Sequence, residues 1–156
     1  MLPLQQKTNS PWHRLVPPAK DPFKRLAGYE SLAVEVDRLI SENADKPYFV
    51  FSDDYHTASS MAFYLRQQPQ TYVINMGRRM NQFDLWPGIK RFEGQQIIGI
   101  YLTRSAEIQP AVVEGFEQTL HLSSFPIHYR GETLHSFQIG VFENLIHIQE
   151  VDIKTY

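Results

Sequence analysis

The sequence contains no cysteine. This absence excludes a disulfide framework, a zinc site built on cysteine, an iron–sulfur cluster and a thiol nucleophile. It does not fix the compartment, because cytosolic domains and bacterial extracytoplasmic domains can both lack cysteine. A chain of 156 residues can fold without such links, since a domain of this size buries about 68–70% of its unfolded surface. We therefore expect one hydrophobic core.

An excess of positive charge is also missing, with 15 Lys and Arg against 17 Asp and Glu and a net charge of -2. Such a chain offers no strong field to a phosphate backbone, so nucleic acid is not an expected partner. The longest apolar run, Ile97–Leu102, is far shorter than the ~20 residues that a membrane-spanning helix needs. The N-terminus lacks the charged start and apolar stretch of a secretory signal. The chain is expected neither to span a membrane nor to direct its own export.

Proline is concentrated near the N-terminus, where residues 1–26 hold five of the ten prolines. Proline removes backbone donors and disfavours helix before it. We therefore predict an extended arm or linker over residues 1–26 and a single α/β domain over residues 27–156. Apolar residues at helical spacing between Ala27 and Asn43 predict an amphipathic helix at the start of this domain.

Strands and helices then alternate along the chain. The apolar run Tyr48–Phe51 is typical of a strand covered on both faces. Asp54 is placed to cap a helix that continues to Leu65, and residues 71–76 have the pattern of a second buried strand. The connection is long enough for a parallel crossover.

The second half of the chain changes character. A long loop with one irregular turn is expected over residues 77–95, followed by a buried strand over residues 97–102 and a short helix from Pro110 to Phe116. Alternating apolar residues on both sides of Arg130–Gly131 predict a hairpin with an irregularity, and residues 146–153 predict a last strand. The sum is a three-layer α/β sandwich whose mixed sheet has parallel strands first and an antiparallel hairpin at the C-terminal end.

The first candidate site is the turn that follows the first strand. Asp53, Tyr55 and His56 stand there, where open α/β sheets bind ligands and where a helix N-terminus can meet a phosphate or a sugar hydroxyl. The run has a superficial likeness to the turn of an aspartyl-phosphate phosphatase, but Tyr55 stands where a second acidic residue would be needed. A purely structural role is the alternative, with Asp54 as the helix cap and Asp53 bound to neighbouring donors.

The second candidate is the long loop after the second strand, which combines two guanidinium groups, two amides, a carboxylate and an aromatic ring. Arginine presents a planar fork to phosphate, amides and carboxylates bind sugar hydroxyls, and tryptophan stacks on a sugar face. An internally bonded loop with an Arg79–Asp84 pair is the alternative. Both segments follow carboxyl ends of neighbouring strands, so we predict one ligand-binding site lined by residues of both. Its candidates are Asp53, Tyr55, His56, Arg78, Arg79, Asn81, Gln82, Asp84 and Trp86.

Other chemistry finds little support in the sequence. The six histidines are dispersed and form no HExxH motif, so neither a metal nor another cofactor is expected. No GxSxG elbow or GxxxxGK[ST] loop occurs, and we assign no catalytic residue.

Three stretches of sequence are similar to one family. They are residues 21–29 (DPFKRLAGY), 58–65 (ASSMAFYL) and 75–86 (NMGRRMNQFDLW). In this order they resemble the C-terminal extracytoplasmic segment of bacterial membrane glycosyltransferases related to protein mannosyltransferases and aminoarabinose transferases. The likeness covers roughly Asp21 to Phe142, and residues 75–86 are its most specific part. In the turn that contains Tyr55, the family often has Gln after the tyrosine, whereas this chain has His56.

The resemblance implies an accessory domain that is not catalytic by itself. In the family, a multi-helix membrane part takes the sugar from a polyprenyl-phosphate donor, and its catalytic acidic residues lie in an early extracytoplasmic loop without a counterpart here. The implied partners are that membrane-embedded part and a polyprenyl-phosphate sugar or a glycan acceptor, and the implied location is the periplasmic face of the inner membrane. The alternative hypothesis is a freestanding α/β ligand-binding domain or small enzyme acting on a sugar or phosphate.

Overall fold

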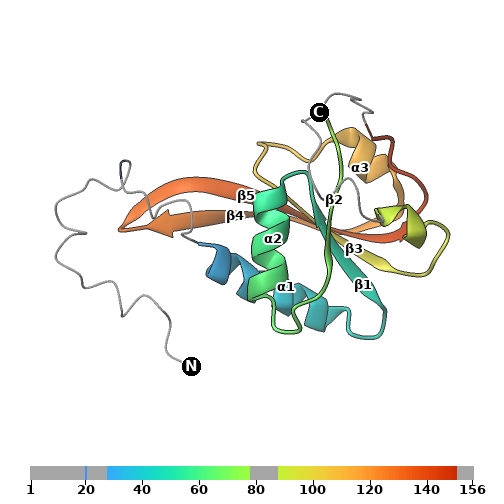
Figure 1. Cartoon of the computed structure of the whole chain (residues 1–156), viewed down its shortest axis with the longest axis horizontal. Coiled ribbons are helices and arrows are strands. Elements are labelled where there is room, and N and C mark those ends of the chain that lie inside the picture. The colour runs from blue at the N-terminus through green and yellow to red at the C-terminus, as the bar shows by residue number, and fades with distance from the viewer. Residues whose placement is uncertain (1–19, 21–27, 78–87, 151–156) are drawn as a thin grey trace.

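A computed structural model describes Lys20, residues 28–77 and residues 88–150. Five strands form one mixed sheet in the order β2-β1-β3-β5-β4 (Figure 1). Their bounds are β1 Tyr48–Ser52, β2 Thr71–Val73, β3 Ile98–Thr103, β4 Phe116–Tyr129 and β5 Glu132–Leu145. β1 pairs in parallel with β2 and with β3, whereas β5 is antiparallel to both β3 and β4. The predicted α/β fold with a mixed sheet and a C-terminal hairpin is confirmed.

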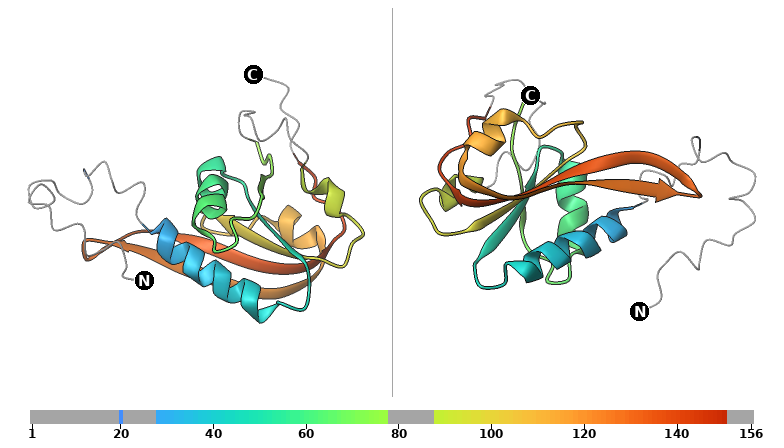
Figure 2. Two further views of the ribbon diagram at one scale, coloured as in Figure 1. Left: turned by 60° about the horizontal axis from the view of Figure 1, so that its bottom comes forward. Right: turned by 180° about the vertical axis from the view of Figure 1, so that it is seen from behind.

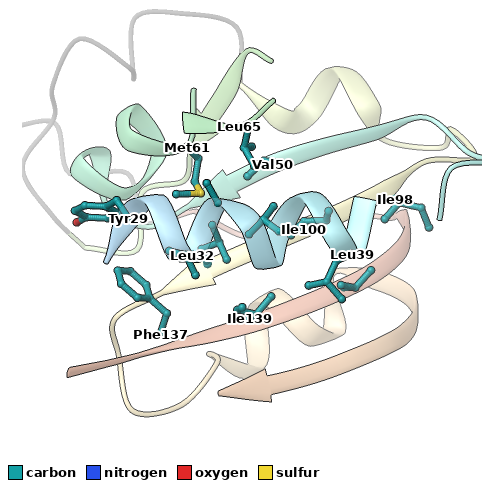
Figure 3. Close-up of a cluster of buried hydrophobic side chains, with 14 of the residues drawn as sticks. Tyr29, Leu32, Leu39, Val50, Met61, Leu65, Ile98, Ile100, Phe137 and Ile139 are labelled. Atoms are coloured by element: carbon teal, nitrogen blue, oxygen red, sulfur yellow. The ribbon is translucent and has the colours of Figure 1, made fainter. Parts of the chain in front are cut away.

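Helices lie on both faces of this sheet. They are α1 Tyr29–Glu42, α2 Tyr55–Tyr64, the 3-10 helix η6 Ile89–Phe92 and α3 Pro110–Glu114. α1 and α2 pack on one face, where their apolar residues form a core with Val50, Ile100 and Ile139 (Figure 3). η6 and α3 pack on the opposite face through Ile89 and Val112. The sheet is therefore the middle of three layers.

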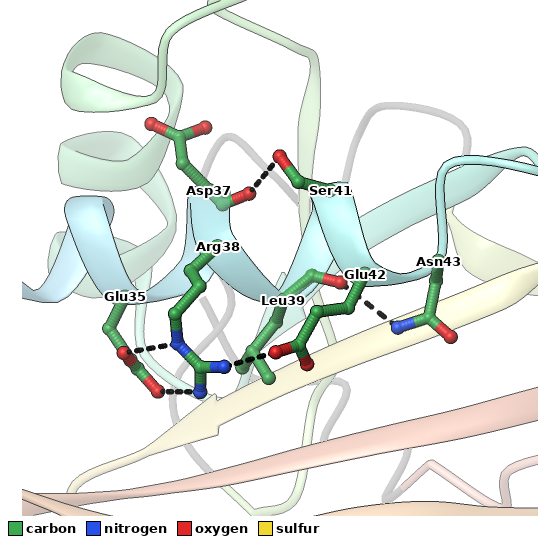
Figure 4. Close-up of polar contacts among 7 residues, drawn as sticks. All are labelled: Glu35, Asp37, Arg38, Leu39, Ser41, Glu42 and Asn43. Carbon is green, nitrogen blue, oxygen red and sulfur yellow. Dashed lines mark hydrogen bonds and ion pairs between the residues drawn. The ribbon is translucent and has the colours of Figure 1, made fainter.

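α1 forms because its sequence is amphipathic. The residues that recur every three or four positions are all buried: Tyr29, Leu32, Ala33, Val36 and Leu39. On its exposed side, Arg38 donates hydrogen bonds to Glu35 and Glu42 (Figure 4). Such pairs, three and four residues apart, add a few tenths of a kcal/mol each, so burial of the apolar stripe is what holds the helix on the sheet.

The opposite face of the sheet is mostly aromatic. The ring of Phe49 stacks on Phe92 with centroids 4.6 Å apart, and Phe116 stacks on Phe142 at 5.0 Å. Gly99 leaves room for these rings, because a Cβ at this position would lie 2.7 Å from two atoms of the Phe116 ring. The glycine in the predicted strand 97–102 therefore has a packing role.

The hairpin of β4 and β5 turns at Arg130 and Gly131, which both have positive φ values, 51° and 82°. Two such residues give a turn whose twist matches that of the strands. The hairpin extends past the other strands of the sheet (Figure 2). Its register shifts between Thr119 and His121 and between Ile127 and His128, which confirms the predicted irregularity.

Two predicted boundaries were wrong. β2 ends at Val73 rather than at residue 76, because the N–H of Asn75 donates to Glu150 and its side chain accepts from Gly77. Phe116 begins β4 and does not continue α3, since Gly115 ends that helix.

Residues 146–150 form no strand. The N–H groups of Ile146 and His147 both donate to the carbonyl of Gly115, and Ile148 is buried in the aromatic core. The predicted arm, apart from Lys20, lies outside the described residues. Among the helices of the described part, none is long and apolar enough to cross a membrane.

Candidate functional site

The carboxyl ends of β1, β2 and β3 meet at one edge of the sheet. The N–H of Ile74, just after β2, donates to the carbonyl of Ser52 at 2.9 Å, and Ser52 pairs with Leu102 of β3. Residues that follow these three strands therefore lie side by side. This confirms that the turn after β1 and the segment after β2 leave neighbouring parallel strands at the same edge.

The connections that follow β1 and β3 leave this edge toward opposite faces of the sheet. β1 continues into α2, which lies on the face of α1, whereas β3 leads to α3 on the aromatic face. β2 and β3 also lie on opposite sides of β1. Such a switch point in an open α/β sheet is where ligands most often bind.

Asp54 has the structural role that the sequence allowed for. Its carboxylate accepts from the N–H groups of His56 and Thr57 and from the Thr57 hydroxyl, at 3.1, 3.4 and 2.8 Å. These bonds satisfy two of the free N–H groups at the start of α2. Asp54 is thus the helix cap.

Asp53 points to β3 instead. Its Oδ2 accepts from the Thr103 hydroxyl at 3.0 Å, and the Thr103 oxygen in turn accepts from the N–H of Ser105 at 3.1 Å. Asp53 and Thr103 therefore lie together at the switch point. The Asp53 side chain is partly exposed, whereas Thr103 is buried.

Tyr101 lies next to this pair and is fully buried, with its ring 4.9 Å from that of Phe51. Burial raises the pKa of Tyr101 well above its usual range, and the negative charge of Asp53 adds to the effect. Hydrogen bonding to Asp53 also raises the pKa of the Tyr101 hydroxyl and hydrogen bonding to Thr103 lowers it, but among the described residues neither contact has normal hydrogen-bond geometry.

A second carboxylate reaches the same edge from the end of the described chain. Glu150 Oε1 accepts from the N–H of Asn75 at 2.9 Å. No sequence pattern indicated this contact, because the two residues are far apart along the chain and residues 146–153 were expected to form a strand.

Tyr55 and His56 lie in the first turn of α2, where both are exposed, and their rings are 4.1 Å apart. The other predicted site residues, Arg78, Arg79, Asn81, Gln82, Asp84 and Trp86, lie outside the described residues. Thr103 and Tyr101 were not predicted. A signal for Thr103 was present, because this polar residue directly follows the predicted strand 97–102. The rule that ligands bind at the carboxyl ends of parallel strands, which we used for the first two strands, applies to this strand as well.

Among the described histidines, three lie on the hairpin: His121, His128 and His135. His147 Nδ1 is 2.9 Å from Glu93, and His128 Nδ1 is 3.0 Å from the Thr133 hydroxyl. Within residues 28–77 and 88–150, no three His, Asp or Glu side chains form a group that could hold a metal ion.

No protein-family model, no curated protein and no solved structure matches this chain. The family resemblance therefore rests on the three quoted stretches of sequence.

Proposed function

We propose that the chain is the extracytoplasmic C-terminal domain of a membrane glycosyltransferase that uses a polyprenyl-phosphate sugar. In this role it binds part of the lipid-linked sugar or of the glycan acceptor, and the membrane-embedded part of the enzyme performs the transfer. The three stretches of sequence similar to that family are the origin of the proposal.

One structural observation supports a ligand site where the resemblance is most specific. The 75–86 stretch begins directly after β2, and the backbone contact between Ile74 and Ser52 places its start beside Asp53. Guanidinium and amide groups that follow there suit a phosphate or sugar. The candidate residues of both segments thus start from adjacent positions at the switch-point edge of the sheet.

The proposal assigns recognition to this domain and gives no residue a catalytic role. Asp54, the most suggestive acidic residue of the turn, is occupied by the N–H groups and the hydroxyl that it caps. In the family that the chain resembles, the reacting sugar is handled by acidic residues of the membrane part.

Ligand-observed NMR on the whole chain tests the proposal. Saturation transfer is measured to a short-chain polyprenyl-phosphate analogue, to simple hexoses and to nucleotide sugars, with the wild type and an Arg79→Ala, Asp84→Ala double variant. We expect transfer to a sugar-bearing or phosphate-bearing compound that the double variant loses while its far-UV circular dichroism stays unchanged. Silence across the panel with folded protein would remove ligand recognition from the proposal.

A freestanding ligand-binding domain is the second candidate. It is favoured by the observation that residues of the described part cover both faces of the sheet. The reading frame upstream of Met1 separates the two. A continuous frame with several apolar segments of ~20 residues supports the glycosyltransferase domain, and a stop codon followed by a ribosome-binding site supports the freestanding protein.

A further inference from the structure

β4 is an edge strand that lacks the charged side chains usual at such a position. It ends the sheet order and, within the described part of the chain, pairs only with β5. An edge strand displays unpaired N–H and C=O groups, which proteins commonly guard with charged residues. Residues 118–129 contain no Asp, Glu, Lys or Arg, although these residues make up 21% of the chain. This side of the hairpin is therefore open to another strand.

Two interruptions bound the regular part of this edge. Leu120 has no partner in β5, because the register shifts between Thr119 and His121. Pro126 pairs with β5 but has no N–H to donate. Residues 121–125 lie between these interruptions and pair with β5 one for one. We call residues 121–125 the β4 edge segment.

Pro126 also determines which backbone groups of the segment face outward. In an antiparallel ladder, alternate residues direct their N–H and C=O groups toward the neighbouring strand. Proline fits an edge strand where its nitrogen faces away from that neighbour. Ser124 and Leu122, two and four residues before Pro126, therefore direct their backbone groups to the open edge. The remaining residues of the segment bond to β5.

The side chains of Leu122 and Ser124 lie on the face of the sheet opposite α1. Their partners Gly140 and Gln138 alternate along β5 with residues that pack against α1, such as Ile139. The Leu122 side chain is 56% exposed. Apolar surface therefore accompanies the free backbone groups, and a strand that pairs with this edge would bury both.

We propose that the β4 edge segment pairs antiparallel with the same segment of a second copy, about a two-fold axis at Ser123. In this register, Leu122 lies opposite Ser124 of the second copy, and each such pair exchanges both backbone hydrogen bonds. The two interruptions also coincide. Leu120 lies opposite Pro126 of the second copy, because both are equally far from Ser123 along the strand. The contact is therefore self-complementary, as a two-fold interface requires.

The position of the interruptions favours this axis over its neighbours. An axis at Ser124 would set Pro126 opposite Leu122 and lose a donor. An axis at Leu122 would set the irregular Leu120 opposite Ser124. The axis at Ser123 uses every outward donor of the segment, and it brings the two Leu122 side chains within diagonal reach of each other. Since the segment contains no Asp, Glu, Lys or Arg, no like charges meet across it.

Sedimentation velocity over a range of concentrations tests the self-association of the whole chain. Leu122→Lys places an ammonium group on each side of the axis, which is a natural way to guard a strand edge. Val34→Lys is the matched control, because Val34 is 67% exposed on α1, which packs on the other face of the sheet, and the change adds the same charge. Far-UV circular dichroism checks that the variants fold, and NMR follows the hydrogen exchange of individual amides.

We expect a monomer–dimer equilibrium for the wild type and for Val34→Lys. The dissociation constant of Leu122→Lys should be at least about tenfold higher, because the change acts twice in a symmetric contact. In the wild type, the amides of Leu122 and Ser124 should exchange more slowly as the concentration rises. The other amides of the segment already bond to β5, so their slow exchange should not depend on concentration.

A wild type that is monomeric at every concentration would overturn the proposal and leave this edge to a strand of another protein or to no partner. So would a dimer that Leu122→Lys does not weaken, or one that Val34→Lys weakens equally, because the contact would then lie elsewhere. A dimer in which the Leu122 and Ser124 amides still exchange fast would contradict the strand pairing. This last measurement needs no variant, so it decides the question even where Leu122→Lys fails to fold.

Discussion

Replacement of Gly99 by alanine isolates the packing of the aromatic face. Gly99 lies in the central strand β3, and an added Cβ would lie 2.7 Å from Cε1 and Cζ of Phe116 and 3.0 Å from Cζ of Phe49. The backbone at Gly99 does not have positive φ, and alanine loses less chain entropy than glycine in a strand. Any loss of stability therefore comes from the contact with the rings. Overpacking of this kind costs about 1–3 kcal/mol, and the stacked neighbours of both rings restrict their movement.

Urea unfolding followed by far-UV circular dichroism measures the effect. We expect Gly99→Ala to lower the free energy of unfolding by about 1–3 kcal/mol. Phe116→Leu replaces the ring that meets the new Cβ with a smaller side chain, so the double variant should lose less than the two single variants together, with a coupling of about 0.5–3 kcal/mol. Gly88→Ala is the control, because its Cβ would meet no atom within 4 Å, and it should stay within about 0.5 kcal/mol of the wild type.

A Gly99→Ala protein with the same free energy of unfolding as the wild type would refute this reasoning. So would strictly additive losses in the double variant, because the penalty would then not come from the Phe116 ring.

Three further measurements concern single side chains. Asp54→Ala should lower the free energy of unfolding by about 1–2 kcal/mol, because it removes the cap of α2 and leaves the buried Thr57 hydroxyl without its carboxylate; Asp54→Ser should restore most of the loss in the same urea assay, and equal losses would contradict the cap. Burial, helped by the charge of Arg104, lowers the pKa of His135, so its NMR titration should fall below the usual value of about 6.5. The folded state then binds fewer protons, and the stability due to His135 is present above about pH 6.5 and lost as the pH falls below it; a His135→Gln variant with the same acid dependence would contradict this. For Tyr101, burial raises the pKa, so its phenolate absorbance should be missing from a titration of folded protein near pH 10, and stability should fall above about pH 10; folded Tyr101→Phe should give the same absorbance change near pH 10 as the wild type but a smaller fall in stability above it, and an equal fall would contradict this.

The elements with strong patterns could be predicted from the sequence. The apolar stripe of α1 and the continuous apolar run of β1 lie where the periodicity predicted them. Asp54 was recognisable as a cap because its position before an apolar helical stripe has a local cause. Local rules were sufficient wherever the stabilising contact lies within a few residues.

The errors arose where a distant residue decides the local structure. β2 ends early because Asn75 bonds to Glu150, and residues 146–150 follow Gly115 instead of pairing as a strand. The pair of Asp53 and Thr103 was missed for the same reason, since only the parallel register of β1 and β3 brings the two residues together. Periodicity reports which face of an element is apolar, and it carries no information about which distant partner that element meets.

The strand order has a consequence for how the chain folds. The hairpin of β4 and β5 closes over a two-residue turn, so it can form within microseconds without the rest of the sheet. The central strand β3 has no such neighbour, because its two partners, β1 and β5, both lie far from it along the chain. During synthesis, the buried strand β3 must therefore remain without β5 until the hairpin has emerged, and this interval is when the chain is most exposed to aggregation.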